Sequence, residues 1–134
     1  MPGYSGTPLP KKLGIKDGFH VSLVDAPNDV TAELKPFLTK CEAVTDAKGR
    51  IDFAMVFSKS ASALTKEFKR VSKQLSPAGM IWVSWPKKSS GVPTDLTENI
   101  VRETGLAAGL VDVKVCAVTD VWSGLKFVRR VKDR

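Results

Sequence analysis

Residues 80–98, MIWVSWPKKSSGVPTDLTE, indicate how the rest of the chain is arranged. The run of apolar and β-branched residues through Trp85 is typical of a strand that is buried on both faces. The Pro, Gly, Ser and paired Lys that follow indicate a loop. From Thr94 the sequence predicts a helix, because Asp95 and Glu98 have the spacing of a capping box. A buried strand, a polar loop and a helix in this order predict one unit of an α/β fold.

A second buried strand and an amphipathic helix precede this stretch. Residues 51–58, IDFAMVFS, are almost continuously apolar, and residues 60–75 carry apolar side chains at steps of three and four. The residues of this apolar stripe are Ala61, Leu64, Phe68, Val71 and Leu75. Residues 76–79, SPAG, are expected to end the helix. Further upstream the sequence predicts a strand at 19–25, a short helix at 30–37 and a short strand at 41–44.

Two strands are expected after the helix of residues 94–108, whose predicted apolar face is Leu96, Ile100, Thr104 and Ala108. Residues 110–121 alternate between apolar and polar side chains, and residues 122–124 form a turn that leads into a strand at 125–131. These two strands predict an antiparallel hairpin. The order of elements favours an α/β fold with three layers, Rossmann-like and methyltransferase-like, with a mostly parallel sheet and a C-terminal antiparallel hairpin.

The composition is that of an ordinary soluble protein. A chain of 134 residues is expected to form one domain, residues 1–134, with residues 1–18 as an N-terminal arm packed on the body. The two cysteines, Cys41 and Cys116, lack zinc-ligand spacing and indicate reduced thiols in a cytoplasmic protein. No segment has the composition of a signal peptide or a membrane span, so no membrane association is expected. The net charge of +7 favours anionic partners, although the basic residues are spread along the sequence, as in many soluble proteins.

The loop after Trp85 is the strongest candidate for a binding site, because ligands of open parallel sheets bind beyond the carboxyl ends of the strands. Lysine ammonium groups, serine hydroxyls and a helix N-terminus together are the parts of an anion site. The alternative is a solvated loop followed by an ordinary helix cap. The spacing is not that of a P-loop. The candidate residues of this loop are Lys87, Lys88, Ser89, Ser90, Thr94 and Asp95.

The loop after the first strand lacks the glycines of a nucleotide-binding turn, which argues against binding of a standard cofactor. Asp25 in this loop either holds a ribose or an amine, or only ends the strand. Trp85 and Trp122 stand at strand ends and are either packing residues or a stacking surface for a ring. His20, the single histidine, stands at the opposite end of the sheet and is expected to be structural.

Three stretches of the chain carry a resemblance to a known family. They are residues 3–9 (GYSGTPL) with 12–15 (KLGI), residues 85–88 (WPKK) with 91–97 (GVPTDLT), and residues 109–112 (GLVD) with 114–118 (KVCAV) and 122–125 (WSGL). Together they resemble an uncharacterised bacterial domain-of-unknown-function family, number three thousand and fifty-two. The resemblance implies a small cytoplasmic domain with no established activity and provides no catalytic residues. It also implies that the N-terminal arm folds back onto the body. One hypothesis is that the arm covers the strand ends and contributes Tyr4, Ser5 or Thr7 to the site.

The sequence does not disclose a reaction, and whether the protein is an enzyme stays open. The first hypothesis is non-catalytic binding of an anionic or nucleotide-like small molecule at the carboxyl edge of the sheet. The second is a minimal S-adenosylmethionine-dependent methyltransferase. The third is a basic module that binds nucleic acid or protein, and an apolar sheet edge is compatible with a homodimer. The cofactor is left unknown.

Overall fold

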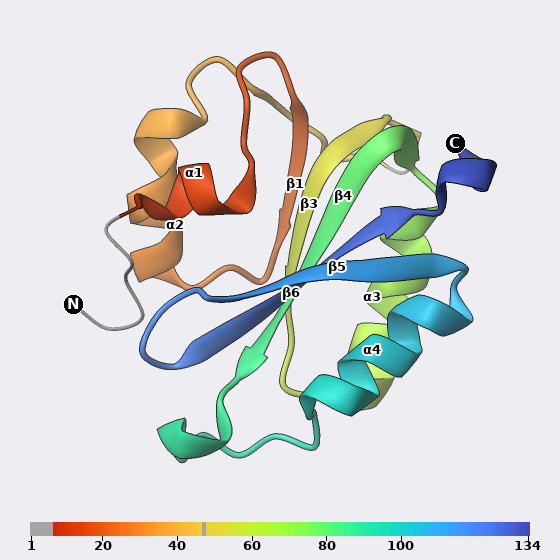
Figure 1. The fold of residues 1–134 in the computed structure, drawn as a ribbon. Coiled ribbons are helices and arrows are strands. Elements are labelled where there is room, and N and C mark those ends of the chain that lie inside the picture. Colours follow the sequence, from red (N-terminus) through yellow and green to blue (C-terminus); the bar gives the residue numbers. More distant parts are fainter. Residues whose placement is uncertain (1–6, 47) are drawn as a thin grey trace.

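A computed structural model describes residues 7–46 and 48–134, so Tyr4 and Ser5 lie outside the described residues. A six-stranded sheet forms the centre of the molecule, in the order β2-β1-β3-β4-β6-β5 (Figure 1). Strands β1 to β4 pair in parallel, and β6 runs antiparallel to both of its neighbours, β4 and β5. The strands are β1 (His20–Val24), β2 (Glu42–Ala43), β3 (Ile51–Phe57), β4 (Leu75–Pro86), β5 (Leu110–Ala117) and β6 (Trp122–Arg129).

The helices cover both faces of this sheet, which gives the predicted three layers (Figure 1). Helices α1 (Leu9–Leu13) and α2 (Asn28–Leu34) lie on one face, and α3 (Ala61–Ser72) and α4 (Glu98–Ala107) on the other. The described residues also form three short 3-10 helices, η1 (Lys35–Phe37), η2 (Lys88–Ser90) and η3 (Val131–Asp133). The predicted alternation of strands and helices and the C-terminal antiparallel hairpin are therefore confirmed.

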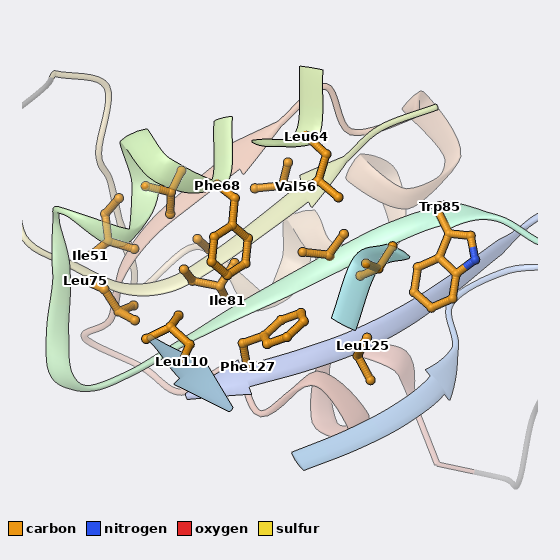
Figure 2. Packing of buried hydrophobic residues seen from close by; sticks show 14 of the residues in the cluster. Ile51, Val56, Leu64, Phe68, Leu75, Ile81, Trp85, Leu110, Leu125 and Phe127 are labelled. Carbon is orange, nitrogen blue, oxygen red and sulfur yellow. The ribbon is translucent and has the colours of Figure 1, made fainter. Parts of the chain in front are cut away.

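Each face of the sheet has its own apolar core. Under α3 and α4, Phe68 meets Phe127 edge to face, with ring centroids 5.3 Å apart. Figure 2 shows both rings among the other side chains of this core. Under α1 and α2, Leu9 and Leu13 are fully buried in a cluster that includes Phe53 of β3 and Trp82 of β4. The indole Nε1 of Trp82 donates a hydrogen bond of 2.8 Å to the carbonyl of Leu13, which fixes α1 to the middle of β4.

The expected stop at residues 76–79 is wrong, because these residues belong to β4. Helix α3 ends at Ser72, and Leu75 pairs with Ile51 on β3. The register then shifts, so that Phe53 pairs with Met80. This shift is a β-bulge, and it accommodates residues 76–79 within the strand. Pro is tolerated here because the pairing is irregular where its missing N–H would otherwise be needed.

Helix α4 begins at Glu98 rather than at Thr94, because Thr97 caps it by accepting a hydrogen bond of 3.2 Å from the amide of Ile100. The predicted apolar face is confirmed in part: Leu96 is buried and Ile100 packs against the core, whereas Ala108 is exposed and the buried residues of the helix are Val101 and Gly105. Gly105 lies so close to the ring of Phe127 that it has no room for a Cβ atom.

Strand β5 ends at Ala117, earlier than expected. The hydroxyl of Thr119 accepts hydrogen bonds of 3.1 Å from the amides of Val121 and Trp122, and this closes the turn into β6. The turn places Trp122 at the same edge of the sheet as the ends of β1, β3 and β4.

Candidate functional site

A hollow of about 500 Å³ lies at the carboxyl ends of β1 and β3. We name it the Asp25 hollow. It contains a carboxylate, an ammonium group, hydroxyl groups and two aromatic rings. Its lining residues are Asp25, Pro27, Phe57, Ser58, Lys59, Ser60, Ala63 and Trp122. Apolar walls with a few convergent polar groups are typical of a small-molecule site.

Asp25 has two unusual properties in this hollow. Its φ of 55° makes it the non-glycine residue with a left-handed backbone among those described. Its side chain is exposed, and its carboxylate has no hydrogen bond or ion pair in the described part of the chain. Strained backbone conformations of this kind concentrate at functional sites. Asp tolerates this conformation better than most residues, so the turn forms here without the glycine that the sequence lacks.

A second hollow, of about 860 Å³, lies beyond the end of β4. We name it the lysine hollow. Lys87, Lys88, Ser89 and Thr94 line it, together with Thr97 and Glu98 at the start of α4. The ammonium groups of Lys87 and Lys88 have no ion pair among the described residues. Free ammonium groups beside a helix N-terminus favour an anionic ligand. The structure therefore places four of the residues that the sequence singled out in this loop, Lys87, Lys88, Ser89 and Thr94, around one hollow.

Ser90 and Asp95 have structural roles and do not line either hollow. The hydroxyl of Ser90 donates a hydrogen bond of 2.6 Å to the carbonyl of Lys87 and accepts one of 3.2 Å from the amide of Val92. The carboxylate of Asp95 accepts a hydrogen bond of 2.7 Å from the amide of Ala61. Asp95 therefore caps α3, whereas the sequence predicted that it would open α4.

Thr94 joins the two hollows. Its hydroxyl donates a hydrogen bond of 2.7 Å to the carbonyl of Lys59, which lines the Asp25 hollow. The amide of Asp95 donates a further bond of 3.3 Å to the same carbonyl. The loop after β4 is thus tied to the loop after β3, and the two hollows share this boundary.

The two tryptophans differ in their surroundings. Trp85 is only 5% exposed and packs in the core beneath α3 and α4, so it forms the floor of the lysine hollow. Trp122 is half-buried and meets Phe57 edge to face at 5.3 Å. Its position in the wall of the Asp25 hollow leaves the indole available to contact a ligand.

The sequence did not single out Ser58, Lys59 and Ser60 as site residues. They follow a buried strand, which was the available signal, but they lack a distinctive motif. The ammonium group of Lys59 has no ion pair among the described residues. The serine hydroxyls are partly engaged, since that of Ser58 donates to the carbonyl of Ser60 at 3.0 Å and that of Ser60 accepts from the amide of Ala63 at 3.3 Å.

A second polar cluster lies at the amino ends of the strands, away from both hollows. His20 lies between Asp52 and Glu42, with its Nδ1 3.0 Å from Asp52 and its Nε2 3.2 Å from Glu42. Burial raises the pKa of Asp52, but hydrogen bonds from the His20 amide, the His20 ring and the Ser76 hydroxyl outweigh it and leave the pKa lowered. These contacts join β1, β2, β3 and β4, which agrees with the structural role expected for His20.

The cysteines and acidic residues provide no metal centre in residues 7–46 and 48–134, where no group of three potential ligands comes together. Cys41 and Cys116 are free thiols. Burial raises the pKa of Cys116, which disfavours its reactive thiolate form, while Lys12 and Lys114 act in the opposite direction. Within the described ranges, no helix combines the length and the apolar character that crossing a bilayer requires.

Known proteins resemble this chain in sequence and in fold. A family model described as "Protein of unknown function (DUF3052)" matches residues 10–131. No curated protein matches the chain.

Among solved structures, the 1,6-didemethyltoxoflavin-N1-methyltransferase of Burkholderia thailandensis, with bound S-adenosylhomocysteine, has a TM-score of 0.62 at 15% identity, over 90% of this chain and 74% of that one. The magnesium protoporphyrin IX methyltransferase of Synechocystis PCC 6803, with bound SAM, has a TM-score of 0.59 at 10% identity, over 91% and 74%. The precorrin-6y C5,15-methyltransferase of Geobacter metallireducens has a TM-score of 0.61 at 11% identity, over 91% and 86%. The fold is therefore methyltransferase-like.

Proposed function

The chain belongs to the DUF3052 family of proteins of unknown function, and we propose that it binds an S-adenosyl compound in the Asp25 hollow and an anionic small molecule in the lysine hollow. The observation that carries the proposal is the free carboxylate of Asp25, held by a left-handed backbone at the carboxyl end of β1. Structures of the same fold are named as methyltransferases with bound S-adenosyl compounds. This arrangement favours a methyltransferase over the non-catalytic binding module.

The residues of the Asp25 hollow suit an S-adenosyl compound in part. A carboxylate accepts hydrogen bonds from ribose hydroxyls or from an amine, and the indole of Trp122 offers a face or edge to the adenine. The free ammonium group of Lys59 can pair with the carboxylate of the amino-acid portion. The backbone amides of a glycine-rich loop are absent, and Pro27 before α2 has no N–H to donate. The ammonium group of Lys59 would therefore replace the backbone donors, while the carboxylate of Asp25 accepts hydrogen bonds from the ribose or the amine.

When bound, S-adenosylmethionine carries a methyl group on a sulfonium centre that a nucleophile can accept. The residues of this chain would bind the cofactor and the methyl acceptor and orient them toward each other. Asp25 would hold the nucleoside, Trp122 would exclude water from one side, and Lys87 and Lys88 would hold the negative charge of the methyl acceptor in the adjoining hollow. The bond between Thr94 and the carbonyl of Lys59 would keep the two ligands at a constant separation.

Titration calorimetry with S-adenosylhomocysteine tests the first half of the proposal. We expect binding by the natural protein and at least a tenfold weaker affinity for Asp25→Ala, because a hydrogen bond to a charged group contributes about 1.5–3 kcal/mol. Asp29→Asn is the matched control, since Asp29 is an exposed carboxylate outside the hollow. The absence of heat with S-adenosylhomocysteine and S-adenosylmethionine at high protein concentration would contradict the proposal.

A thermal-shift screen of phosphorylated and carboxylated metabolites tests the lysine hollow. A ligand at 100 times its dissociation constant stabilises the native state by about 2.7 kcal/mol, which a melting curve resolves. The shift should disappear in Lys87→Ala and Lys88→Ala and persist in Lys11→Ala, which removes an exposed lysine of α1. A melting-temperature shift that persists in both Lys87→Ala and Lys88→Ala would mean that the anion binds elsewhere.

A cytoplasmic location stays a prediction that rests on the cysteine pattern.

A further inference from the structure

Two segments that meet on one surface contribute most of the net positive charge, although basic residues occur along the whole sequence. Residues 66–73 contain four cationic side chains and one carboxylate, and residues 129–134 again contain four and one, so these two segments carry a net charge of +6 in a chain whose total is +7. We name this surface, made by the exposed face of α3 and by residues 129–134, the basic surface. We propose that it binds the phosphate backbone of a nucleic acid.

The cations of α3 form one stripe. Lys66, Lys69, Arg70 and Lys73 follow one another at steps of three and four and surround a shallow hollow of about 450 Å³ together with Gln74. At 3.6 residues per turn, this stripe is diametrically opposite the buried stripe of Leu64, Phe68 and Val71. Packing of the apolar stripe on the sheet therefore turns the cations outward. Glu67, the carboxylate in this segment, is already paired with Arg70 at 2.8 Å.

The C-terminal segment extends the stripe. The guanidinium of Arg129 donates hydrogen bonds of 2.9 Å to the carbonyls of Ser72 and Leu75, at the end of α3. In Figure 1 the C-terminus lies beside the same end of α3. Arg129 thus connects the C-terminal segment to the end of α3, and its neighbours Arg130 and Lys132 remain exposed. The favourable interaction of Arg129 with the helix C-terminus gives a reason for this placement.

Nucleic acid suits this surface better than a membrane does. A helix that lies on a bilayer must insert its apolar face, but the apolar face of α3 is buried in the core. What remains outward is a row of cations about 10 Å long from Lys66 to Lys73, which matches the dense line of charge on a nucleic acid strand. Because the row contains no aromatic side chain for stacking, the expected binding depends on salt and not on sequence.

Fluorescence anisotropy with a labelled 24-base-pair DNA duplex and a single-stranded RNA of 24 nucleotides tests the proposal, with vesicles containing phosphatidylserine as a third probe. The test variant combines Lys66→Ala, Lys69→Ala and Lys73→Ala. The matched control combines Lys35→Ala, Lys40→Ala and Lys48→Ala, which removes the same charge from exposed positions near β2. Circular dichroism checks that both variants fold.

At about 50 mM salt we expect the test variant to lose at least tenfold in affinity for nucleic acid and the control to lose less than threefold. The slope of log affinity against log salt should become shallower by about two to three in the test variant, at 0.7–0.9 per lost phosphate contact. Equal losses in the two variants would overturn the proposal, since binding would then follow net charge alone. Binding to vesicles but to neither nucleic acid would also overturn it. Because neither hollow is changed, calorimetry with S-adenosylhomocysteine should give the same result in all three proteins.

Discussion

At the scale of single residues, Asp25 combines backbone strain with an unpaired carboxylate. A left-handed backbone costs a non-glycine residue about 1–2 kcal/mol, less for Asp than for most. Glycine would remove this strain, although it also makes the unfolded chain more flexible. We therefore expect Asp25→Gly to leave the free energy of unfolding unchanged or to raise it by up to about 1 kcal/mol, while affinity for S-adenosylhomocysteine falls at least tenfold. Urea denaturation and calorimetry measure the two effects.

Asn is the informative comparison at this position, because it also tolerates the left-handed conformation but carries no charge. Asp25→Asn should keep the stability of the natural protein and still weaken binding. If Asp25→Gly instead destabilised the protein by more than about 1 kcal/mol, the carboxylate would have a structural role that its lack of partners does not show.

Asp52 predicts a dependence of stability on pH. Its native-state pKa lies below the ordinary value of 3.8, because the hydrogen bonds from His20 and Ser76 outweigh the effect of burial. The ionised carboxylate therefore stabilises the fold above pH 3.8, and this contribution is lost as the pH falls through the native-state pKa. Asp52 is partly buried, and we expect Asp52→Asn to lower the free energy of unfolding at pH 7 by about 1–3 kcal/mol, because hydrogen bonds to a charged group contribute in this range.

The difference between Asp52→Asn and the natural protein should shrink when urea denaturation is repeated at pH values below 3.8. Asp120→Asn, which alters an exposed carboxylate in the turn before β6, should show no such convergence. A difference that stays constant from pH 7 to pH 3 would mean that packing, and not ionisation, explains the loss.

At the scale of elements, Gly105 decides how closely α4 approaches the sheet. Glycine inside a helix usually costs about 1 kcal/mol relative to alanine. Here a Cβ atom would overlap the ring of Phe127, which is itself fully buried. We therefore expect the opposite sign: Gly105→Ala should lower the free energy of unfolding by about 1–3 kcal/mol, the range for overpacking a core.

A double-mutant cycle with Phe127→Leu identifies the cause of this effect. The smaller side chain should make room for the Cβ atom, so that Gly105→Ala costs less in the Phe127→Leu background than in the natural protein. Leu106→Ala, at an exposed position one residue further along α4, is the control for general effects on the helix. Additive losses in the cycle would contradict a clash with Phe127.

The order and type of the elements follow from the sequence because they depend on local patterns. The alternation of strands and helices, and the apolar stripe of Leu64, Phe68 and Val71, can be recognised within short segments of the sequence. The errors have a different origin. The bulge in β4 depends on pairing with Ile51, and the buried face of α4 depends on Phe127 from β6. Both are contacts between segments far apart in the chain, which propensity and periodicity do not encode.

The candidate site was predictable to the same degree. A polar loop after a buried strand identified Lys87 and Lys88, since that signal is local. The actual role of Asp95 as the cap of α3 depends on a contact with Ala61, 34 residues earlier. The left-handed turn at Asp25 was missed because the sequence rule for such turns expects glycine. The basic surface was missed because its two halves are separated by more than fifty residues and meet only where Arg129 binds the end of α3.

At the scale of the whole molecule, α1 covers part of one face of the sheet beside α2, although it has only five residues. A helix of this length is not stable alone, so tertiary contacts must hold it. Leu9 and Leu13 are fully buried, and the carbonyl of Leu13 accepts the bond from Trp82 in the middle of β4. The strand that α1 covers is the one that ends at the lysine hollow. The N-terminal segment therefore supports the core behind the site.

Leu13→Ala tests this support. Removing a fully buried leucine side chain should leave a cavity and lower the free energy of unfolding by about 2–5 kcal/mol, with a clear fall in melting temperature. Lys11→Ala, on the exposed side of the same helix, should change stability by less than about 0.5 kcal/mol. Trp82→Phe keeps most of the ring and removes the bond to the Leu13 carbonyl, so it should fall between the two. If Leu13→Ala melted at the temperature of the natural protein, α1 would be detached in solution and the core beneath it would be stable without its cover.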